Sequence, residues 1–275
     1  MKLHKWESRW DVPSLNPACS QVEAYLRFSG ASFTVSERNT PYTSPTGVLP
    51  YLELEDNGVE DDNPSNSLMD GTAAASAIIR YLKKEKGLDL DTSLSPVEAA
   101  ELEAFTVLAE TKLAPASAYF TWVDYENYKK HTQGAYGESL PVILNHYVPW
   151  RWRSAITTSM HGKSAPQVLE DVALVYKAIA ARLGTQKFFF GNRVTSLDAL
   201  LFAHLSFHQR APMAADHLRP IMDKFPELGR YVDGILKEHF SCPLPAPPSF
   251  AAPSTSGTSS EPAVFSLQRW SSATS

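Results

Sequence analysis

The chain has 275 residues, of which 43% are hydrophobic and 20% are charged, so it can bury a core and is not disordered or fibrous as a whole. Its net charge of −5 argues against nucleic acid as the main partner, because phosphate binding needs a basic surface. Two cysteines, Cys19 and Cys242, are too few for a disulfide framework or a cysteine-rich zinc site, and a reducing compartment fits best. No leader peptide is apparent, and no apolar run reaches the roughly 18 residues that span a bilayer.

Residues 1–90 alternate between strand and helix patterns. Pro17 opens a predicted helix, and Gly30 ends it. The predicted strands are residues 3–6, 33–37 and 48–54, with a hairpin turn at 57–58. A second helix follows, so the order is β-α-β and then β-β-α. This segment is the predicted N-terminal domain.

Residues 91–240 are predicted to be helical throughout. Three capping boxes mark helix starts, at Ser95, Ser164 and Thr195. In the third box, Asp198 stands three residues after Thr195, and we expect its side chain to cap that helix. These elements define a predicted C-terminal helical domain.

Residues 241–275 differ in composition from the rest of the chain. They include 10 Ser and 6 Pro but only two charged residues, Glu261 and Arg269. Such a stretch cannot bury enough apolar area to offset the entropy of ordering it. We therefore expect a disordered tail.

Pro50 stands inside a predicted strand, where proline is normally excluded because it removes a ladder donor. A cis Leu49–Pro50 bond at the start of the strand would make it acceptable. The segment 48–50 resembles the thioredoxin-like half of glutathione transferases, and the Thr195–Asp198 box resembles the buried capping box of their helical half. The predicted fold class is therefore glutathione-transferase-like, with an N-terminal thioredoxin-like domain followed by an all-helical C-terminal domain.

The residues that handle thiols in glutathione transferases are poorly matched here. Such enzymes place a Tyr, Ser or Cys near the first strand-to-helix turn, whereas Asn16 stands directly before Pro17. The clamp for the γ-glutamyl group is usually an acid or amide followed by Ser, whereas residues 70–71 read Asp-Gly. An alternative remains open, namely a glutathione-dependent transferase or peroxidase that uses Ser14 or Cys19. The favoured interpretation of Cys19 is a half-buried helix residue.

His204 and His208 are one helical turn apart, which is a spacing that two metal ligands use. The zinc-protease pattern requires Glu after the first histidine, but Leu205 stands there. We therefore predict no metal site and expect one histidine in the core and the other as a surface cap.

Residues 119–152 contain nine aromatic residues. They could cover the groove between the two domains, or they could form a partner surface, since Trp and Tyr anchor interfaces. The candidate contact residues are Trp122, Asp124, Tyr125, Asn127 and Tyr128.

Several segments together resemble the metaxin family, in order and spacing over about residues 1–240. They are Tyr-Leu-Arg-Phe-Ser-Gly at 25–30, Ser-Pro-Thr-Gly-Val-Leu-Pro at 44–50, Trp-Val-Asp-Tyr-Glu-Asn-Tyr at 122–128, and Phe-Phe-Phe-Gly-Asn at 188–192 with the 195–198 box. Ordinary glutathione transferases lack the third and fourth segments.

The resemblance implies a non-catalytic protein without a cofactor, on the cytosolic side of the mitochondrial outer membrane. It would belong to the sorting and assembly machinery and bind three kinds of partner: its β-barrel core subunit, a second metaxin-like subunit and β-barrel precursors. Some metaxins end in a transmembrane helix, whereas this chain ends in a polar segment, so we expect peripheral attachment through partners. A soluble adaptor of the same fold, acting away from mitochondria, is a third possibility.

Overall fold

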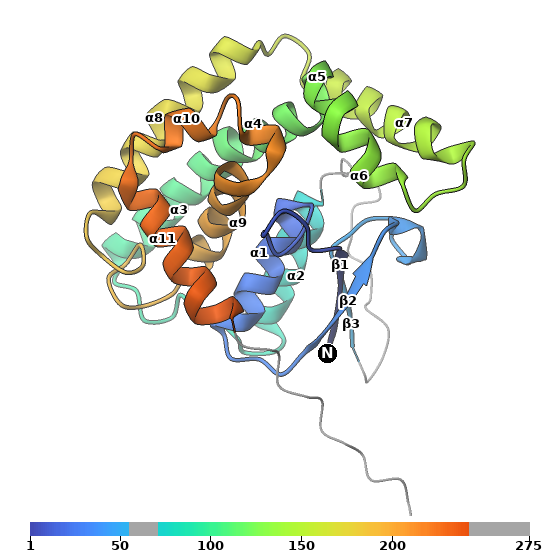
Figure 1. Cartoon of the computed structure of the whole chain (residues 1–275). Coiled ribbons are helices and arrows are strands. Elements are labelled where there is room, and N and C mark those ends of the chain that lie inside the picture. Colours follow the sequence, from blue (N-terminus) through green and yellow to red (C-terminus); the bar gives the residue numbers. More distant parts are fainter. Residues whose placement is uncertain (55–70, 242–275) are drawn as a thin grey trace, which may run out of the picture.

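The computed structural model describes residues 1–54 and 71–241. The predicted hairpin turn at 57–58, Asp70, and the predicted tail from residue 242 onward lie outside the described residues. Figure 1 shows a small sheet at one side of the molecule and helices around and above it.

The sheet has three strands within the described part of the chain, in the order β2-β1-β3. The central strand β1 (Lys2–Trp6) pairs in parallel with β2 (Thr34–Arg38) and antiparallel with β3 (Tyr51–Glu53). The third strand is shorter than the predicted 48–54. The peptide bond between Leu49 and Pro50 is cis, as predicted, and the strand begins only after this proline, which has no N–H for the ladder.

Two helices complete the N-terminal part, α1 (Pro17–Phe28) and α2 (Thr72–Lys84). The side chain of Asn16 accepts a hydrogen bond from the Ala18 N–H at 2.8 Å and so caps α1. Ten residues of α1 are buried, because the helix lies between the sheet and α9 (Ser196–Arg210) (Figure 1). Most sides of this helix therefore face the core, and it has no broad solvent-exposed face.

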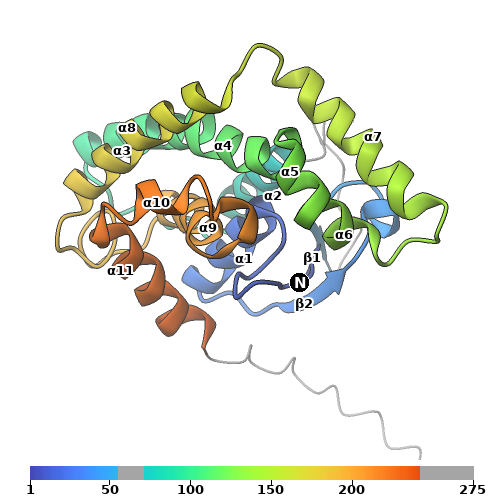
Figure 2. The same cartoon turned by 45° about the horizontal axis from the view of Figure 1, so that its top comes forward.

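The C-terminal part is helical, as predicted. Its remaining helices are α3 (Pro96–Leu108), α4 (Ala114–Ala118), α5 (Tyr125–Asn127), α6 (Gln133–Gly137), α7 (Leu144–Ser159), α8 (Ala165–Leu183), α10 (Arg219–Met222) and α11 (Pro226–Ile235). Short π-helical turns are η2 (Ala109–Leu113), η3 (Tyr119–Val123), η4 (Tyr128–Thr132) and η6 (Leu236–Phe240), and 3-10 turns are η1 (Pro41–Thr43) and η5 (Pro212–Ala214). Figure 2 shows α7 at the edge of the molecule, away from α8 and α11. The boundary near residue 90 stays a prediction.

The predicted cap at Asp198 is confirmed. Its carboxylate accepts hydrogen bonds from the Thr195 N–H at 2.8 Å and from the Thr195 hydroxyl at 2.7 Å. The Phe189 N–H at 2.9 Å and the Tyr231 hydroxyl at 3.0 Å donate to the other oxygen. This fully buried carboxylate thus ties α9 to α11 and to the Phe-Phe-Phe segment.

Candidate functional site

The first strand-to-helix turn holds the residues that thiol chemistry would need. Ser14 is buried, and its hydroxyl donates to the Trp6 carbonyl at 2.9 Å and accepts from the Asn16 N–H at 3.3 Å. Asn16 is also buried and caps α1. Both side chains are thus engaged in local backbone hydrogen bonds that hold this turn in place.

Cys19 is fully buried in α1. Burial raises the pKa of its thiol to about 12, although a hydrogen bond with the Trp6 backbone and the positive charge of Lys5 act in the opposite direction. Since the thiolate is the nucleophile, a thiol that stays protonated and has no access to solvent is chemically inert. The half-buried position predicted for Cys19 is corrected to a fully buried one.

Gly71 lies at the start of α2, where the sequence lacks the clamp serine. It adopts φ +75°, and a Cβ atom there would collide with the Leu49 carbonyl oxygen. The backbone of α2 therefore approaches the backbone of the Leu49–Pro50 segment too closely for any side chain at this position.

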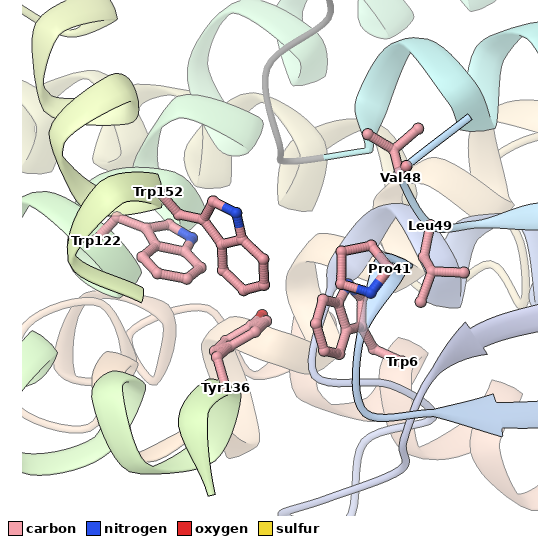
Figure 3. A pocket seen from close by; sticks show the side chains of 8 residues that line it. Trp6, Pro41, Val48, Leu49, Trp122, Tyr136 and Trp152 are labelled. Atoms are coloured by element: carbon pink, nitrogen blue, oxygen red, sulfur yellow. The ribbon is translucent and has the colours of Figure 1, made fainter. Parts of the chain in front are cut away.

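Aromatic side chains fill the space between the two parts of the molecule at this turn. Figure 3 shows Trp122, Tyr136 and Trp152 from the helical part on one side, and Trp6, Pro41, Val48 and Leu49 from the N-terminal part on the other. The ring centroids of Trp6 lie 4.9 Å from Tyr136 and 5.9 Å from Trp152, in edge-to-face arrangements. The Tyr136 hydroxyl donates to the Leu15 carbonyl at 3.0 Å.

The crevice that remains between these rings is small. It offers about 10 Å³ to the centres of water-sized molecules, which is roughly the space that a single water needs. Three of the nine aromatic residues at 119–152 thus line the interdomain groove, namely Trp122, Tyr136 and Trp152, whereas Tyr125, Tyr147 and Trp150 are exposed.

The five predicted contact residues have different environments. Trp122, Asn127 and Tyr128 are buried, with exposed fractions of 5%, 6% and 3%, so their assignment to a contact surface is corrected and they are core residues. Asp124 is half-buried, and Tyr125 is 55% exposed. Tyr125 alone keeps the exposure that an interface anchor needs, and its role in contacts stays a prediction.

These residues instead build a corner of the helical part. The backbone leaves helical geometry at Asp124, whose carboxylate accepts from the Asn127 N–H at 2.8 Å and caps α5. The side-chain amide of Asn127 donates to the Met213 carbonyl at 2.9 Å. The Arg153 guanidinium lies over the rings of Tyr125 and Tyr128, at 5.5 and 5.1 Å from their centroids.

His204 and His208 are both buried, so the expectation that one of them caps the surface is wrong. The hydroxyl of Ser117 bridges them, at 2.9 Å from His204 Nδ1 and 2.8 Å from His208 Nε2. The Tyr176 hydroxyl lies 2.7 Å from His208 Nδ1. Within the described residues, no three Cys, His, Asp or Glu side chains are grouped to hold a metal.

Sequence reasoning missed an exposed apolar surface at the start of α7. We call it the α7 ridge and define it by Val142, Ile143, Leu144, Tyr147 and Trp150, which are 81%, 86%, 42%, 51% and 55% exposed. The available signal was the run Val-Ile-Leu directly after Pro141, which no predicted core pattern used.

Comparisons with known proteins agree on one family. Residues 19–153 match the family described as outer mitochondrial membrane transport complex protein, Tom37. Residues 172–235 match the C-terminal domain of glutathione S-transferase. Metaxin-1 of Bos taurus is 31% identical over 274 residues, which cover 95% of this chain and 82% of the relative. Metaxin-3 of Xenopus laevis is 31% identical over 251 residues, which cover 87% of this chain and 77% of the relative.

Among solved structures, beta-etherase LigF from Sphingobium sp. strain SYK-6 superimposes with a TM-score of 0.55 at 15% identity, covering 87% of this chain and 98% of that one. At this identity the likeness concerns the fold alone. It agrees with the domain match at 172–235, and the predicted glutathione-transferase-like fold is confirmed. The resemblance noted in the sequence motifs is confirmed as well, because a relative 31% identical to this chain is covered over 82% of its length: the chain belongs to the metaxin family.

Proposed function

We propose that the protein is a non-catalytic component of the mitochondrial outer-membrane machinery that imports proteins and inserts β-barrel precursors. The observation that carries this proposal is the family membership, together with the match of residues 19–153 to an outer mitochondrial membrane transport complex protein. In this role the chain works on the cytosolic face of the membrane. Its partners are the β-barrel core subunit, a second metaxin-like subunit and the precursors themselves.

The state of the thiol-handling region supports a role without catalysis. Cys19 is buried and protonated, and Ser14 is hydrogen-bonded to the backbone. Gly71 has no room for a clamp hydroxyl, and aromatic side chains narrow the interdomain crevice to a space that accepts about one water. Each of these four features opposes binding or activation of a glutathione thiol.

Affinity purification of the tagged chain from detergent-solubilised mitochondria tests the proposed role. We expect a β-barrel outer-membrane subunit and a second metaxin-like protein to co-purify, and depletion of the chain to lower the yield of newly assembled outer-membrane β-barrels. Recovery of the chain without any outer-membrane subunit, together with unchanged β-barrel assembly after depletion, would contradict the proposal.

A second measurement addresses the enzymatic alternative. The purified chain is incubated with glutathione and an electrophilic aromatic halide, and thioether formation is followed against a Ser14→Ala and a Cys19→Ala variant. We expect the rate to equal the buffer rate in all three proteins. A rate above buffer that either substitution abolishes would establish a glutathione-dependent activity.

A further inference from the structure

The α7 ridge contains the two large apolar residues with the highest exposed fractions in the described part of the chain. Val142 and Ile143 precede α7 directly, and their side chains are 81% and 86% exposed. Tyr147 and Trp150 follow on the helix, with ring centroids 5.8 Å apart. In Figures 1 and 2 the connection between α6 and α7 reaches the outer edge of the molecule.

Helix geometry explains why this face has no partner within the chain. Val148, Trp152 and Ile156 are spaced four residues apart and are buried against the aromatic cluster. Ile143, Tyr147 and Trp150 are spaced four and three residues apart and therefore share a different face of the helix. That outer face is apolar although it is exposed, which is typical of a surface that meets a non-aqueous environment.

The segment that contains the ridge has a positive formal charge, whereas the rest of the chain is negative. Residues 139–169 contain no Asp or Glu but include Arg151, Arg153 and Lys163, for a formal charge of +3. Because the whole chain carries −5, the remaining residues carry −8. Arg151 and Lys163 are exposed; Arg151 directly follows Trp150 of the ridge, and Lys163 follows the C-terminal end of α7.

A further cation is held beside the ridge by hydrogen bonds. Lys129 donates to the Gln133 side chain at 3.3 Å, and that amide contacts His146 Nδ1 at 2.7 Å. His146 lies on α7 between the exposed Leu144 and Tyr147. The apolar side chains are thus flanked by basic groups, which suits an anionic surface.

We propose that the α7 ridge is a membrane-contact surface, which inserts Val142, Ile143 and Trp150 into the headgroup region of a bilayer that contains anionic lipids. Exposed aliphatic side chains, Trp and Tyr beside them, and an excess of basic over acidic residues are features of interfacial membrane binding. The exposed acid nearest in sequence, Glu138, is paired with Arg9. Among residues 1–54 and 71–241, no helix has the length and hydropathy of a membrane span.

A membrane contact of the ridge goes beyond the proposed role in the import machinery, and a different experiment tests each of them. Co-purification of subunits is measured in detergent, where no bilayer is present. Vesicle binding is measured with the purified chain alone, where no partner is present.

Flotation of the full chain with phospholipid vesicles tests the proposal. Vesicles of phosphatidylcholine alone are compared with vesicles that also contain phosphatidylserine, at low and at physiological ionic strength. We expect binding to the anionic vesicles that weakens as salt is added. The double variant Ile143→Ser/Trp150→Ser should lower partitioning by about tenfold or more, because two large apolar side chains leave the interface.

Matched variants separate the ridge from general surface effects. Val97→Ser/Leu174→Ser removes two apolar side chains that are 71% and 64% exposed on α3 and α8, and binding should be unchanged. Arg151→Gln with Lys163→Gln should weaken binding, whereas Lys177→Gln on the exposed surface of α8 should do so far less. Circular dichroism of each variant checks that it is folded.

Two results would overturn the proposal. The wild-type chain could fail to float with anionic vesicles, or the Ile143→Ser/Trp150→Ser variant could float as well as the wild type. In the second case, loss of binding to an outer-membrane subunit in detergent would make the ridge a protein interface.

Discussion

Ser117, His204, His208 and Tyr176 form a buried hydrogen-bonded chain of polar side chains, with neighbouring atoms 2.7 to 2.9 Å apart. Two proton arrangements satisfy it: either Tyr176 donates to His208 Nδ1, His208 Nε2–H donates to Ser117 and Ser117 donates to His204 Nδ1, or all three bonds run in the opposite direction. Both histidines are neutral in either arrangement. Burial lowers the pKa of His204 to about 4, and it lowers the pKa of His208 well below its ordinary value.

We therefore predict that the protein loses stability in mild acid. In the unfolded chain both histidines titrate near their ordinary value of 6.5, whereas in the folded chain they resist protonation. Because the unfolded state then binds more protons, the free energy of unfolding is fully retained above pH 6.5 and falls as the pH drops toward 4. The slope should approach about 1.4 kcal/mol per pH unit for each histidine.

Urea unfolding at a series of pH values measures this slope. A His208→Gln variant should be less stable at neutral pH, because it disturbs the chain of hydrogen bonds, and its slope between about pH 6.5 and pH 4.5 should be shallower. The exposed His161→Gln substitution is the control and should leave the slope unchanged. An identical slope in His208→Gln and wild type would show that the buried histidines do not cause the acid sensitivity.

At the scale of single elements, the segment 122–128 turns the chain from η3 into α5 and η4. The Asp124 carboxylate caps α5, and the Asn127 amide fixes the corner to the Met213 carbonyl. This segment is one of those that mark the family in the sequence. Its side chains mostly serve this corner, and Tyr125 is the exposed member.

Asp124→Ala should lower the stability of the protein by about 1 kcal/mol, which is typical for the loss of a helix N-cap. Thermal unfolding followed by circular dichroism measures the shift in Tm. Glu126→Ala, an exposed neighbour, serves as the control and should leave Tm nearly unchanged. If Asp124→Ala keeps its Tm but loses co-purifying subunits, the side chain contacts partners directly.

The parts of the fold that local signals encode were predictable. Pro17 is the first residue of α1, and Gly30 follows its C-terminal end. The capping boxes mark the starts of α3, α8 and α9. These signals act within a few residues of the chain, so the sequence alone reveals them. The cis bond at Pro50 and the buried Asp198 were expected from the fold family's pattern.

The environments within residues 119–152 were not predictable in the same way. Aromatic residues occur on both faces of α7, so composition does not distinguish the buried Trp152 from the exposed Trp150. Which of them faces inward depends on tertiary packing against Trp6, far away in the sequence. The burial of both His204 and His208 depends likewise on Ser117 and Tyr176 from other helices.

Across the whole molecule, the two parts share their hydrophobic core. Residues Leu3 and Tyr25 of the N-terminal part belong to one buried cluster with Phe120 and Phe202 of the helical part. A second cluster joins Trp6 to Trp122 and Trp152, among other residues. With α1 buried between the sheet and α9, neither part has a complete core of its own, so we expect them to unfold together.

The Tyr136 hydroxyl provides a test of this coupling, because it crosses between the parts to the Leu15 carbonyl. Tyr136→Phe keeps the ring in the aromatic cluster but leaves this buried carbonyl without its donor, and it should cost about 1 to 2 kcal/mol. Tryptophan fluorescence reports on the interface, whereas far-ultraviolet circular dichroism is dominated by the helices. Both midpoints should shift by the same amount in urea, and the exposed Tyr147→Phe substitution should shift neither. If fluorescence changes at lower urea than circular dichroism in Tyr136→Phe, the N-terminal part separates before the helices melt, and the shared core does not hold the molecule together as one cooperative unit.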